Sequence, residues 1–385
     1  MQSTVGKILS VLRDQGTCSR AELARTIGLS TAAISKFTSE LLDVEVVREI
    51  EVSGKQTVGR PSIDLALQPD AYFMIGAHIT VGRVEVVMTD ILLQQISSAQ
   101  FDISRDIEID ILVGGIVQTI EDLIAKSGRQ RSRIRGVGLA VPGAVDVEGR
   151  INLFSNFTQW SNIPFADLLE ARLNLPVTLE HNAAAIALAE SRYGAGRERE
   201  RVLYVYMGGG IGAGITYSRE RVANSNRGRH VELGHIVVDP HGAPCKCGKP
   251  GCLETVFSEG PLLAQLGLDK VPASGLIDAL MQTDGWEERY EQFLQTMATT
   301  AILLLPDMIV LGGHLGAAPE AFYARLEEDL AKRILVPQQR NQLHVVRTSY
   351  LSDAGAIGAA CAGLEQFIFG NPQFSQNRSR VFRGG

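Results

Sequence analysis

The sequence predicts an α-helical head that ends in a β-hairpin, followed by a larger α/β body in two lobes. Residues 1–67 contain three short helical patterns and then two segments of alternating apolar and polar residues. From residue 72 onward, apolar strands, glycine-rich turns and helical segments alternate, as in layered α/β proteins. Three of the five cysteines lie in one Gly/Pro-rich loop within residues 231–254. These observations predict a head at 1–67, a linker at 68–71 and a body from 72.

Length and composition narrow the class of protein. A chain of 385 residues suggests two or three domains, and 45% hydrophobic with 21% charged residues is ordinary for a globular protein. The net charge of −6 argues against a protein that coats nucleic acid non-specifically. Apolar runs such as 301–305 are too short to span a bilayer, and the N-terminus lacks a secretion-signal pattern. Five cysteines, three of them clustered, favour a reducing cytoplasm over a disulfide framework.

The first two helices of the head are predicted from periodicity and caps. Apolar residues recur at helical spacing through 4–15, after which Gly16 ends the helix. Ser19 is placed to cap a second helix, Arg20 to Ile27, and Glu22 three residues later completes a capping box.

Gly28 then provides a turn, and Ser30 or Thr31 caps a third helix that continues through Leu42. Two helices joined by a short turn with glycine form a helix-turn-helix. The N-terminus of the third helix would present short polar groups and one cation to a major groove: Ser30, Thr31, Ser35 and Lys36.

A wing is predicted after the third helix. Residues 46–50 and 62–67 read as two strands of a hairpin whose tip, SGKQTVGRPS, carries Lys55 and Arg60. An arginine in a slim Gly-Arg-Pro turn is suited to a narrow minor groove. Residues 1–67 hold eight Lys and Arg against eight Asp and Glu, so the head has no net positive charge. A small helical protein-interaction module with a polar loop is therefore the alternative.

In the body, strands and helices are expected to alternate with glycines at strand ends. Such turns let backbone N–H groups approach phosphates, although tight packing explains a glycine equally well. The predicted elements are two strands within 72–90, a helix at 107–125, strands at 134–141 and 177–180, a helix at 182–193, a strand at 202–207 that runs into glycines 208–214, and a strand at 308–311 followed by Gly312-Gly313.

The cysteine-rich loop predicts a structural zinc site. Cys245, Cys247 and Cys252 lie within eight residues, among glycines and prolines that allow a tight fold. Three thiolates and one imidazole make a closed tetrahedral site. His235 is the nearest fourth ligand and His241 its competitor. The alternatives are three unliganded thiols, or one disulfide and a free thiol.

The stretch ELGH…CKCGKPGCLE is similar to the zinc-binding signature of the ROK family, which groups sugar kinases and sugar-responsive repressors. His235, Cys245, Cys247 and Cys252 stand at its ligand positions. The resemblance covers nearly the whole chain and implies an actin/hexokinase-like ATPase fold, with lobes at 72–180 and 181–370 and a flexible tail at 371–385. Family members with an added winged helix-turn-helix resemble transcriptional regulators, and many carry a wing like Gly59-Arg60-Pro61.

The resemblance also predicts that kinase catalysis is lost. The first phosphate turn of the family's kinases resembles DxGGT, and this chain has His78, Thr80, Val81 and Gly82 at the matching places. The catalytic base belongs to an ENDAN-like motif in which Asn182 replaces the aspartate. An amide cannot take a proton as a carboxylate does. His181 is adjacent, but neighbouring residues point differently. In the second phosphate loop, Gly209 replaces a threonine.

By the same resemblance, the sugar pocket is retained. Carboxylates and amides are well suited to hydrogen-bond sugar hydroxyl groups, and His235 can face the sugar with the ring nitrogen that does not bind zinc. Asn156 has the alternative of a turn residue and Glu254 that of a helix-start carboxylate, while Val231 replaces a family glycine. The predicted sugar contacts are Asn156, Asn182, Glu232, His235 and Glu254.

Together these features predict a cytoplasmic, sugar-responsive transcriptional regulator, a repressor rather than an activator, of carbohydrate uptake or catabolism genes. It would read palindromic operator DNA as a homodimer or a dimer of dimers, and sugar-driven closure of the lobes would change the spacing of the heads. One alternative is an ATP-dependent sugar kinase with an appended DNA-binding head. Another is a DNA-binding protein whose body has lost its ligands and only dimerises.

Overall fold

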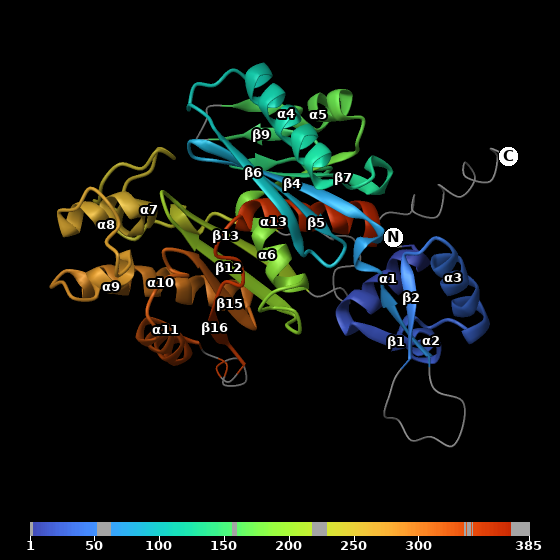
Figure 1. Ribbon diagram of the computed structural model, residues 1–385. Helices are drawn as coiled ribbons and strands as arrows, with labels where there is room; N and C mark the ends of the chain where they lie inside the picture. The colour runs from blue at the N-terminus through green and yellow to red at the C-terminus, as the bar shows by residue number, and fades with distance from the viewer. Residues whose placement is uncertain are drawn as a thin grey trace.

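The computed structural model describes residues 3–51, 63–155, 160–217, 229–334, 336, 340 and 342–370. In the head, the three predicted helices are present, followed by the two strands of the predicted hairpin (Figure 1). A short strand after the first helix was not predicted; it pairs with the second hairpin strand and gives the sheet order β1-β3-β2. The elements are α1 Thr4–Gln15, β1 Thr17–Ser19, α2 Arg20–Ile27, α3 Thr31–Asp43, β2 Val47–Glu51 and β3 Ile63–Leu67.

Side-chain caps fix the starts of the head helices. Ser19 accepts a hydrogen bond from the Glu22 backbone N–H at 3.2 Å, and the Glu22 carboxylate accepts one from the Ser19 N–H at 2.9 Å. This confirms the predicted capping box. Of the two candidates for the third helix, Ser30 is the cap, because its hydroxyl accepts from the Ala33 N–H. Gly28 closes α2 with a left-handed φ of 76°.

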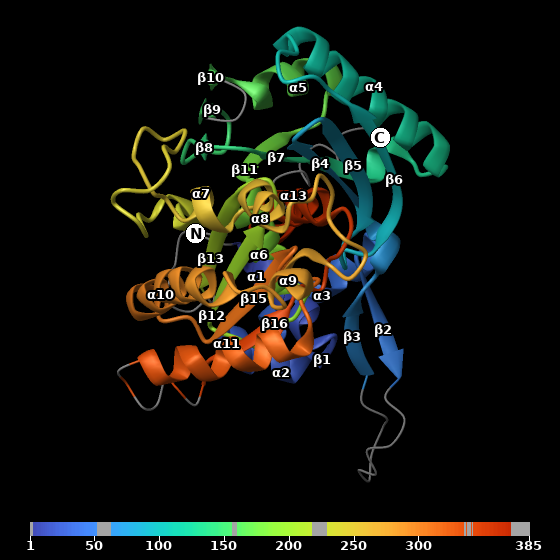
Figure 2. The same ribbon diagram turned by 90° about the vertical axis from the view of Figure 1, so that its left-hand side faces the viewer.

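The first sheet of the body has the order β11-β7-β4-β5-β6. The predicted strand pair in 72–90 forms β4 and β5 around a turn at Gly82, whose φ is 77°. Apolar residues of α4 and α5 cover one face of this sheet and α13 covers the other (Figure 2). The bounds are β4 Phe73–Thr80, β5 Arg83–Asp90, β6 Gln95–Asp102, α4 Ile109–Ser127, β7 Ile134–Val141, α5 Phe165–Leu173, β11 Val177–His181 and α13 Ala354–Leu364; a small sheet of β8 Ala144–Val145, β9 Asn152–Phe154 and β10 Ser161–Ile163 lies beside them.

The second sheet has the order β14-β13-β12-β15-β16. Alternate residues of β12 and β15 point to opposite faces: one set packs with α10 and α11, and the other packs with α6. The bounds are α6 Asn182–Arg192, β12 Arg201–Met207, β13 Ile211–Tyr217, β14 Arg229–Val231, α7 Glu254–Phe257, α8 Glu259–Leu266, α9 Leu276–Leu280, α10 Trp286–Leu304, β15 Met308–Gly313, α11 Glu320–Arg333 and β16 His344–Arg347.

Helices α6 and α13 lie side by side between the two sheets (Figure 1). Their contact is made by small residues. A Cβ atom added to Gly358 of α13 would lie 2.6 Å from the carbonyl carbon of Ala185 in α6. On the sheet side of α13, a Cβ on Gly138 of β7 would lie 1.8 Å from the carbonyl oxygen of Ala359. Backbone therefore approaches backbone directly at both contacts.

The head shares a hydrophobic core with the body. Leu9 and Leu12 of α1 belong to the same buried cluster as Ile357, Cys361 and Phe369 near the C-terminal end of the described chain. The predicted linker 68–71 consists largely of a 3₁₀ turn, Pro69–Ala71. Within the described ranges, no helix combines the length and apolar character needed to cross a membrane.

We expect Gly138→Ala to destabilise the body by about 1–3 kcal/mol or more, because the new methyl group meets the backbone of α13. Gly114→Ala is the matched control: it lies inside α4 with no atom within 4 Å of the added Cβ, so it should stabilise by about 0.5–1 kcal/mol. Urea unfolding of both variants measures the difference, and equal stabilities would contradict this packing.

Candidate functional site

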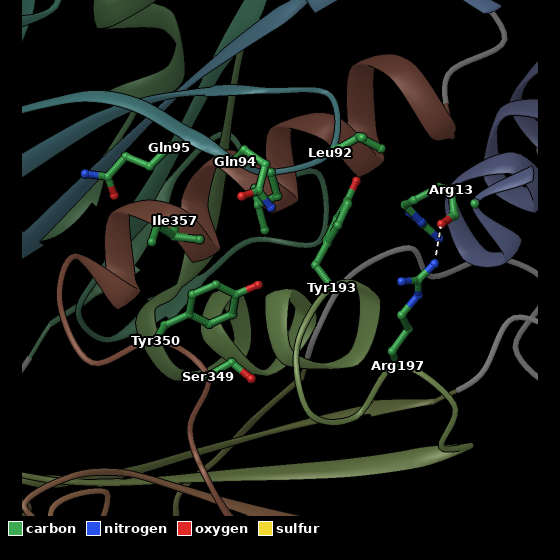
Figure 3. A pocket seen from close by; sticks show the side chains of 11 residues that line it. Arg13, Leu92, Gln94, Gln95, Tyr193, Arg197, Ser349, Tyr350 and Ile357 are labelled. Carbon is green, nitrogen blue, oxygen red and sulfur yellow. Dashed lines mark hydrogen bonds between the residues drawn. The ribbon is translucent and has the colours of Figure 1, made fainter. Parts of the chain in front are cut away.

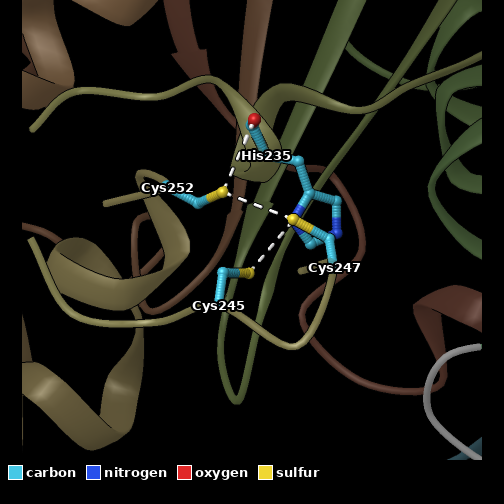
Figure 4. Close-up of side chains that lie close together, drawn as sticks. All are labelled: His235, Cys245, Cys247 and Cys252. Carbon is cyan, nitrogen blue, oxygen red and sulfur yellow. Dashed lines mark hydrogen bonds between the residues drawn. The ribbon is translucent and has the colours of Figure 1, made fainter. Parts of the chain in front are cut away.

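One histidine and three cysteines converge beside the second sheet. The candidate ligand atoms of His235, Cys245, Cys247 and Cys252 all lie within 4.8 Å of one another (Figure 4). Cys245 Sγ is 3.5 Å from His235 Nδ1, and the sulfurs of Cys247 and Cys252 are 3.5 Å apart. Sulfurs bound to one tetrahedral zinc ion are about 3.8 Å apart, as bonds of about 2.3 Å require. The cluster can therefore hold a metal ion of this kind.

The electrostatics of the cluster fit the same conclusion. Burial, together with the neighbouring thiols, raises the pKa of Cys252 to about 12. The pKa of Cys247 is lowered, first by the backbone N–H of Lys249. Three crowded sulfurs cannot all ionise near neutrality unless a cation offsets their charge. His241, the competing fourth ligand, is not in the cluster, and the five cysteines are free thiols rather than disulfides.

Backbone contacts shape the loop. The Cys245 N–H donates to the Lys249 carbonyl at 2.9 Å, and the Gly251 N–H donates to the Ala243 carbonyl at 2.8 Å. Gly251 has a φ of 61°, and a Cβ there would lie 1.5 Å from the carbonyl oxygen of Asp239. The position therefore requires glycine.

The ring nitrogen of His235 that points away from Cys245 lies near several polar side chains. Its Nε2 lies 3.9 Å from the Glu232 carboxylate, which is also 3.8 Å from Nε2 of His230. The His230 ring lies against that of His181, with 4.9 Å between centroids. Burial, and then His230, lowers the pKa of His181 to about 3, so this ring stays neutral. His230 was missed in the sequence: it lies only two residues before Glu232, but its contact with the distant His181 depends on the pairing of β14 with β13.

Asn182 is the first residue of α6. Its amide nitrogen donates to the Ile79 carbonyl of β4 at 3.4 Å. Its side-chain oxygen is buried and has no hydrogen-bond partner among the described residues. An amide oxygen held in this way is available to accept a hydrogen bond from a ligand hydroxyl.

Glu254 begins α7, as expected of a helix-start carboxylate, and it also reaches the glycine-rich turn after β12. Its Oε2 accepts a hydrogen bond from the Ile211 N–H at 3.1 Å. Asn156, the remaining predicted sugar contact, lies outside the described residues.

His78 on β4 is paired with Glu85 on β5. The His78 Nδ1 is 3.1 Å from one carboxylate oxygen of Glu85, and Arg83 Nε donates to the other at 2.8 Å. Burial would raise the pKa of Glu85, but the hydrogen bond and charge of His78, followed by those of Arg83, lower it. Both oxygens of Glu85 are thus engaged, a pairing that sequence patterns did not reveal. The following turn places Val81 at the surface, 53% exposed.

The predicted DNA-facing residues lie at the start of α3. Ser30, Thr31 and Lys36 are exposed, whereas Ser35 is half-buried. Of the head's acidic groups, Glu49 is paired with Arg20 at 2.8 Å and Glu45 lies 3.7 Å from Arg133 of the body. Lys55 and Arg60 at the predicted wing tip lie outside the described residues.

Comparison with known proteins bears on both parts of the chain. Residues 76–365 match the ROK family, and residues 1–48 match a winged helix-turn-helix DNA-binding family. The first match covers well over half of the chain.

Individual relatives include full-length regulators. The DNA-binding transcriptional repressor Mlc of Escherichia coli is 24% identical over 377 residues, which cover 93% of this chain and 92% of that protein. The xylose repressor of Bacillus spizizenii is 26% identical, with 94% of each chain covered. The glucokinase of Thermotoga maritima is 32% identical over 247 residues, which cover 58% of this chain and 77% of the kinase.

A solved ROK family transcriptional regulator, described as a homologue of the E. coli Mlc protein, has the same fold. It superimposes with a TM-score of 0.78 at 24% sequence identity and covers 93% of this chain and 94% of that chain. The head and body therefore occur together in a known structure of this architecture.

We expect the purified protein to hold about one metal ion per chain, and Cys247→Ser to lose it, because closed sites of this type use four protein ligands. Elemental analysis measures the content, and thermal unfolding should show a lower melting temperature for the variant. Lys246→Ala changes an exposed residue of the same loop and serves as the control. A wild-type protein without metal, whose melting temperature a chelator does not change, would contradict the site.

Proposed function

Because the chain belongs to the ROK family, we propose that it is a sugar-responsive transcriptional regulator that binds double-stranded DNA. The observation that carries the proposal is the presence, on one chain, of an exposed and capped α3 and of a body in which the buried side-chain oxygen of Asn182 has no hydrogen-bond partner among the described residues. Mlc and the xylose repressor of Bacillus spizizenii each align over more than nine-tenths of the chain and are named repressors, which favours repression over activation. A xylose repressor among them supports a sugar effector and control of carbohydrate genes.

The sugar site that we propose is formed by Asn182, Glu232, His235 and Glu254, with Asn156 as a further contact from sequence resemblance. The carboxylates accept hydrogen bonds from hydroxyl groups, and the Asn182 amide both donates and accepts. The bound metal is zinc in this proposal, since three thiolates and an imidazole are its usual structural ligands. Zinc would fix His235 on the side facing Glu232 and so join the metal site to the sugar site.

Two features favour a body without kinase activity. Asn182 has no carboxylate to deprotonate a sugar hydroxyl, and its neighbour His181, with a pKa of about 3, is a weak base. At the first phosphate turn, His78 stands in place of the metal-associated carboxylate, and nearby Glu85 is already bound to His78 and Arg83. The relation to a glucokinase keeps an ATP-dependent sugar kinase as the alternative.

Assembly and location follow from how such heads work. One recognition helix reads few base pairs, so two heads on a palindromic operator are needed for specificity. We therefore propose a homodimer, or a dimer of dimers, in the cytoplasm, where free cysteines remain reduced.

Selection of bound fragments from a random DNA pool should enrich a palindromic sequence. On that fragment, Lys36→Ala should weaken binding and reduce the slope of log affinity against log salt by about 1, because one phosphate contact is lost. Lys332→Ala on α11, far from the head in sequence, is the control. Fluorescence anisotropy at several salt concentrations measures the slope. Failure to enrich any sequence would contradict the proposal.

A sugar that binds should raise the melting temperature, because only the folded protein binds it. A panel of hexoses, pentoses and their phosphorylated or N-acetylated forms identifies it by thermal shift. Glu232→Gln should then weaken binding about tenfold or more, since a charged acceptor is lost. Glu328→Gln on α11 is the control.

The same panel tests the kinase alternative in a coupled ADP-release assay, in which we expect no turnover. Turnover that Glu232→Ala abolishes would establish the kinase instead.

A further inference from the structure

Arg13 and Glu365 form a buried ion pair between the head and the body. Arg13 is in the last turn of α1, and its guanidinium donates to the carboxylate of Glu365, which is 352 residues away in sequence. Both side chains are 1% exposed. The Arg13 guanidinium also lies over the ring of Phe369, 4.6 Å from its centroid. The pair, which we call the latch, thus joins the head to the C-terminal end of the described chain.

Residues at and just after the C-terminal end of α6 contact the latch and α1. Arg192, the last residue of α6, has its Nε 3.6 Å from the second oxygen of Glu365. The ring of Tyr193 lies 5.4 Å from the Arg13 guanidinium carbon. Arg197 donates to the carbonyl oxygen of Arg13 at 2.7 Å (Figure 3) and to that of Asp14 at 2.6 Å. These carbonyls are at the C-terminal end of α1, where a cation is favourable.

The other end of α6 is at the proposed sugar site. Asn182 is its first residue. The ring of the preceding His181 contacts the ring of His230, which in turn lies near the carboxylate of Glu232. A helix of 11 residues is about 16 Å long. One helix therefore spans from the ligand-facing amide to the residues around the latch.

Packing makes α6 a stiff connection. Residues Ala183–Arg192 are all buried. A Cβ on Gly214 of β13 would lie 2.5 Å from the Ala183 carbonyl oxygen, so α6 rests on the second sheet with little space between them. The carboxylate of Glu190 accepts hydrogen bonds from the Ser349 N–H at 2.6 Å and the Ala195 N–H at 3.0 Å. A helix held by direct backbone contact moves as a unit with its neighbours.

The junction around the latch includes a cavity lined by both the head and the body. A cavity of about 500 Å³ lies between the head and the body, and its lining includes Arg13, Leu92, Tyr193, Tyr350 and Ile357 (Figure 3). A change in the tilt of the head would alter this space, and the apolar contacts of α1 with the body would shift with it.

We propose that α6 couples the sugar site to the head, and that the Arg13–Glu365 latch fixes the orientation of the head that α6 controls. The coupling rests on the proposed sugar response, whereas the latch does not. A sugar that engages Asn182 favours one position of α6, and Arg192, Tyr193 and Arg197 carry that preference to α1. Because coupling is reciprocal, a head fixed on DNA changes the sugar affinity in turn.

The latch is tested without any ligand, by hydrogen–deuterium exchange of full-length protein. In Glu365→Gln, exchange of the amides in residues 4–15 should be faster by about tenfold or more, because the charged anchor of α1 is lost. Glu320→Gln removes an exposed carboxylate paired with Arg347 and is the control. Unchanged exchange in residues 4–15 would overturn the latch.

A second variant covers the case in which Glu365→Gln does not fold. Arg197→Ala removes an exposed side chain, and we expect exchange at the C-terminal end of α1 to rise by about threefold. Arg199→Ala, in the same loop, is the matched control and should leave this exchange as in the wild type.

The coupling is tested with D-glucose, D-xylose and N-acetyl-D-glucosamine as probes. Protection of residues 231–254 reports binding, and changed exchange in residues 4–15 reports coupling. A change in both segments of the wild type, with the change in 4–15 reduced by Arg197→Ala, supports the proposal. Protection of 231–254 with no change in 4–15 overturns the coupling but leaves the proposed function intact. No protection with any sugar contradicts the sugar response and with it the coupling, while the latch is decided by the ligand-free comparison.

Discussion

The arrangement of the whole chain depends on the contact between α6 and α13, two helices of small residues held between the sheets. Gly358 meets the backbone of Ala185, and Gly138 meets the backbone of α13 from the first sheet. Because these contacts lack large side chains, the backbones of the first sheet, α13, α6 and the second sheet approach one another directly and pack tightly. α13 follows the second sheet in sequence but packs on the first. α13 therefore connects the two halves of the body.

The metal cluster, the proposed sugar contacts and the head are all positioned from this contact. α6 carries Asn182 at one end and Arg192 at the other, while α13 leads directly to Glu365. His235 of the metal cluster lies in a 3₁₀ turn, Leu233–His235, that follows β14 and contacts β13 of the second sheet, on which α6 rests. A buried ion pair costs desolvation of both charges, so it contributes more to a fixed geometry than to net stability. The Arg13–Glu365 pair fits this role, because apolar contacts of α1 already hold the head on the body.

Much of the architecture was predictable because its signals are local. Caps and turns gave the head helices, and apolar runs gave six strands of the body: β4, β5, β7, β11, β12 and β15. Apart from the predicted hairpin strands β2 and β3, the other strands described in the structure were missed, among them β1, which has only three residues, and β6, an edge strand with many exposed polar residues and no strong apolar pattern. The helices α5, α7 to α11 and α13 were not predicted either. Cysteine spacing predicted a metal cluster with His235 as the fourth ligand, and the fold of the loop brings His235, not its competitor His241, to the three cysteines. The pairing of Glu85 with His78 across two strands was not predicted either.

By itself, the sequence determined the local features: the capping box at Ser19, the tight loop of cysteines and glycines, and the amide at position 182. Each depends on residues close in the chain, whose geometry is set by backbone torsions and short-range hydrogen bonds. Only the tertiary structure decided that Arg13 contacts Glu365, that His230 lies against His181, and that one helix joins these two regions. Such contacts depend on how sheets and helices stack. A contact with a distant residue changes the apolar periodicity of neither segment, so it cannot be recognised in the sequence.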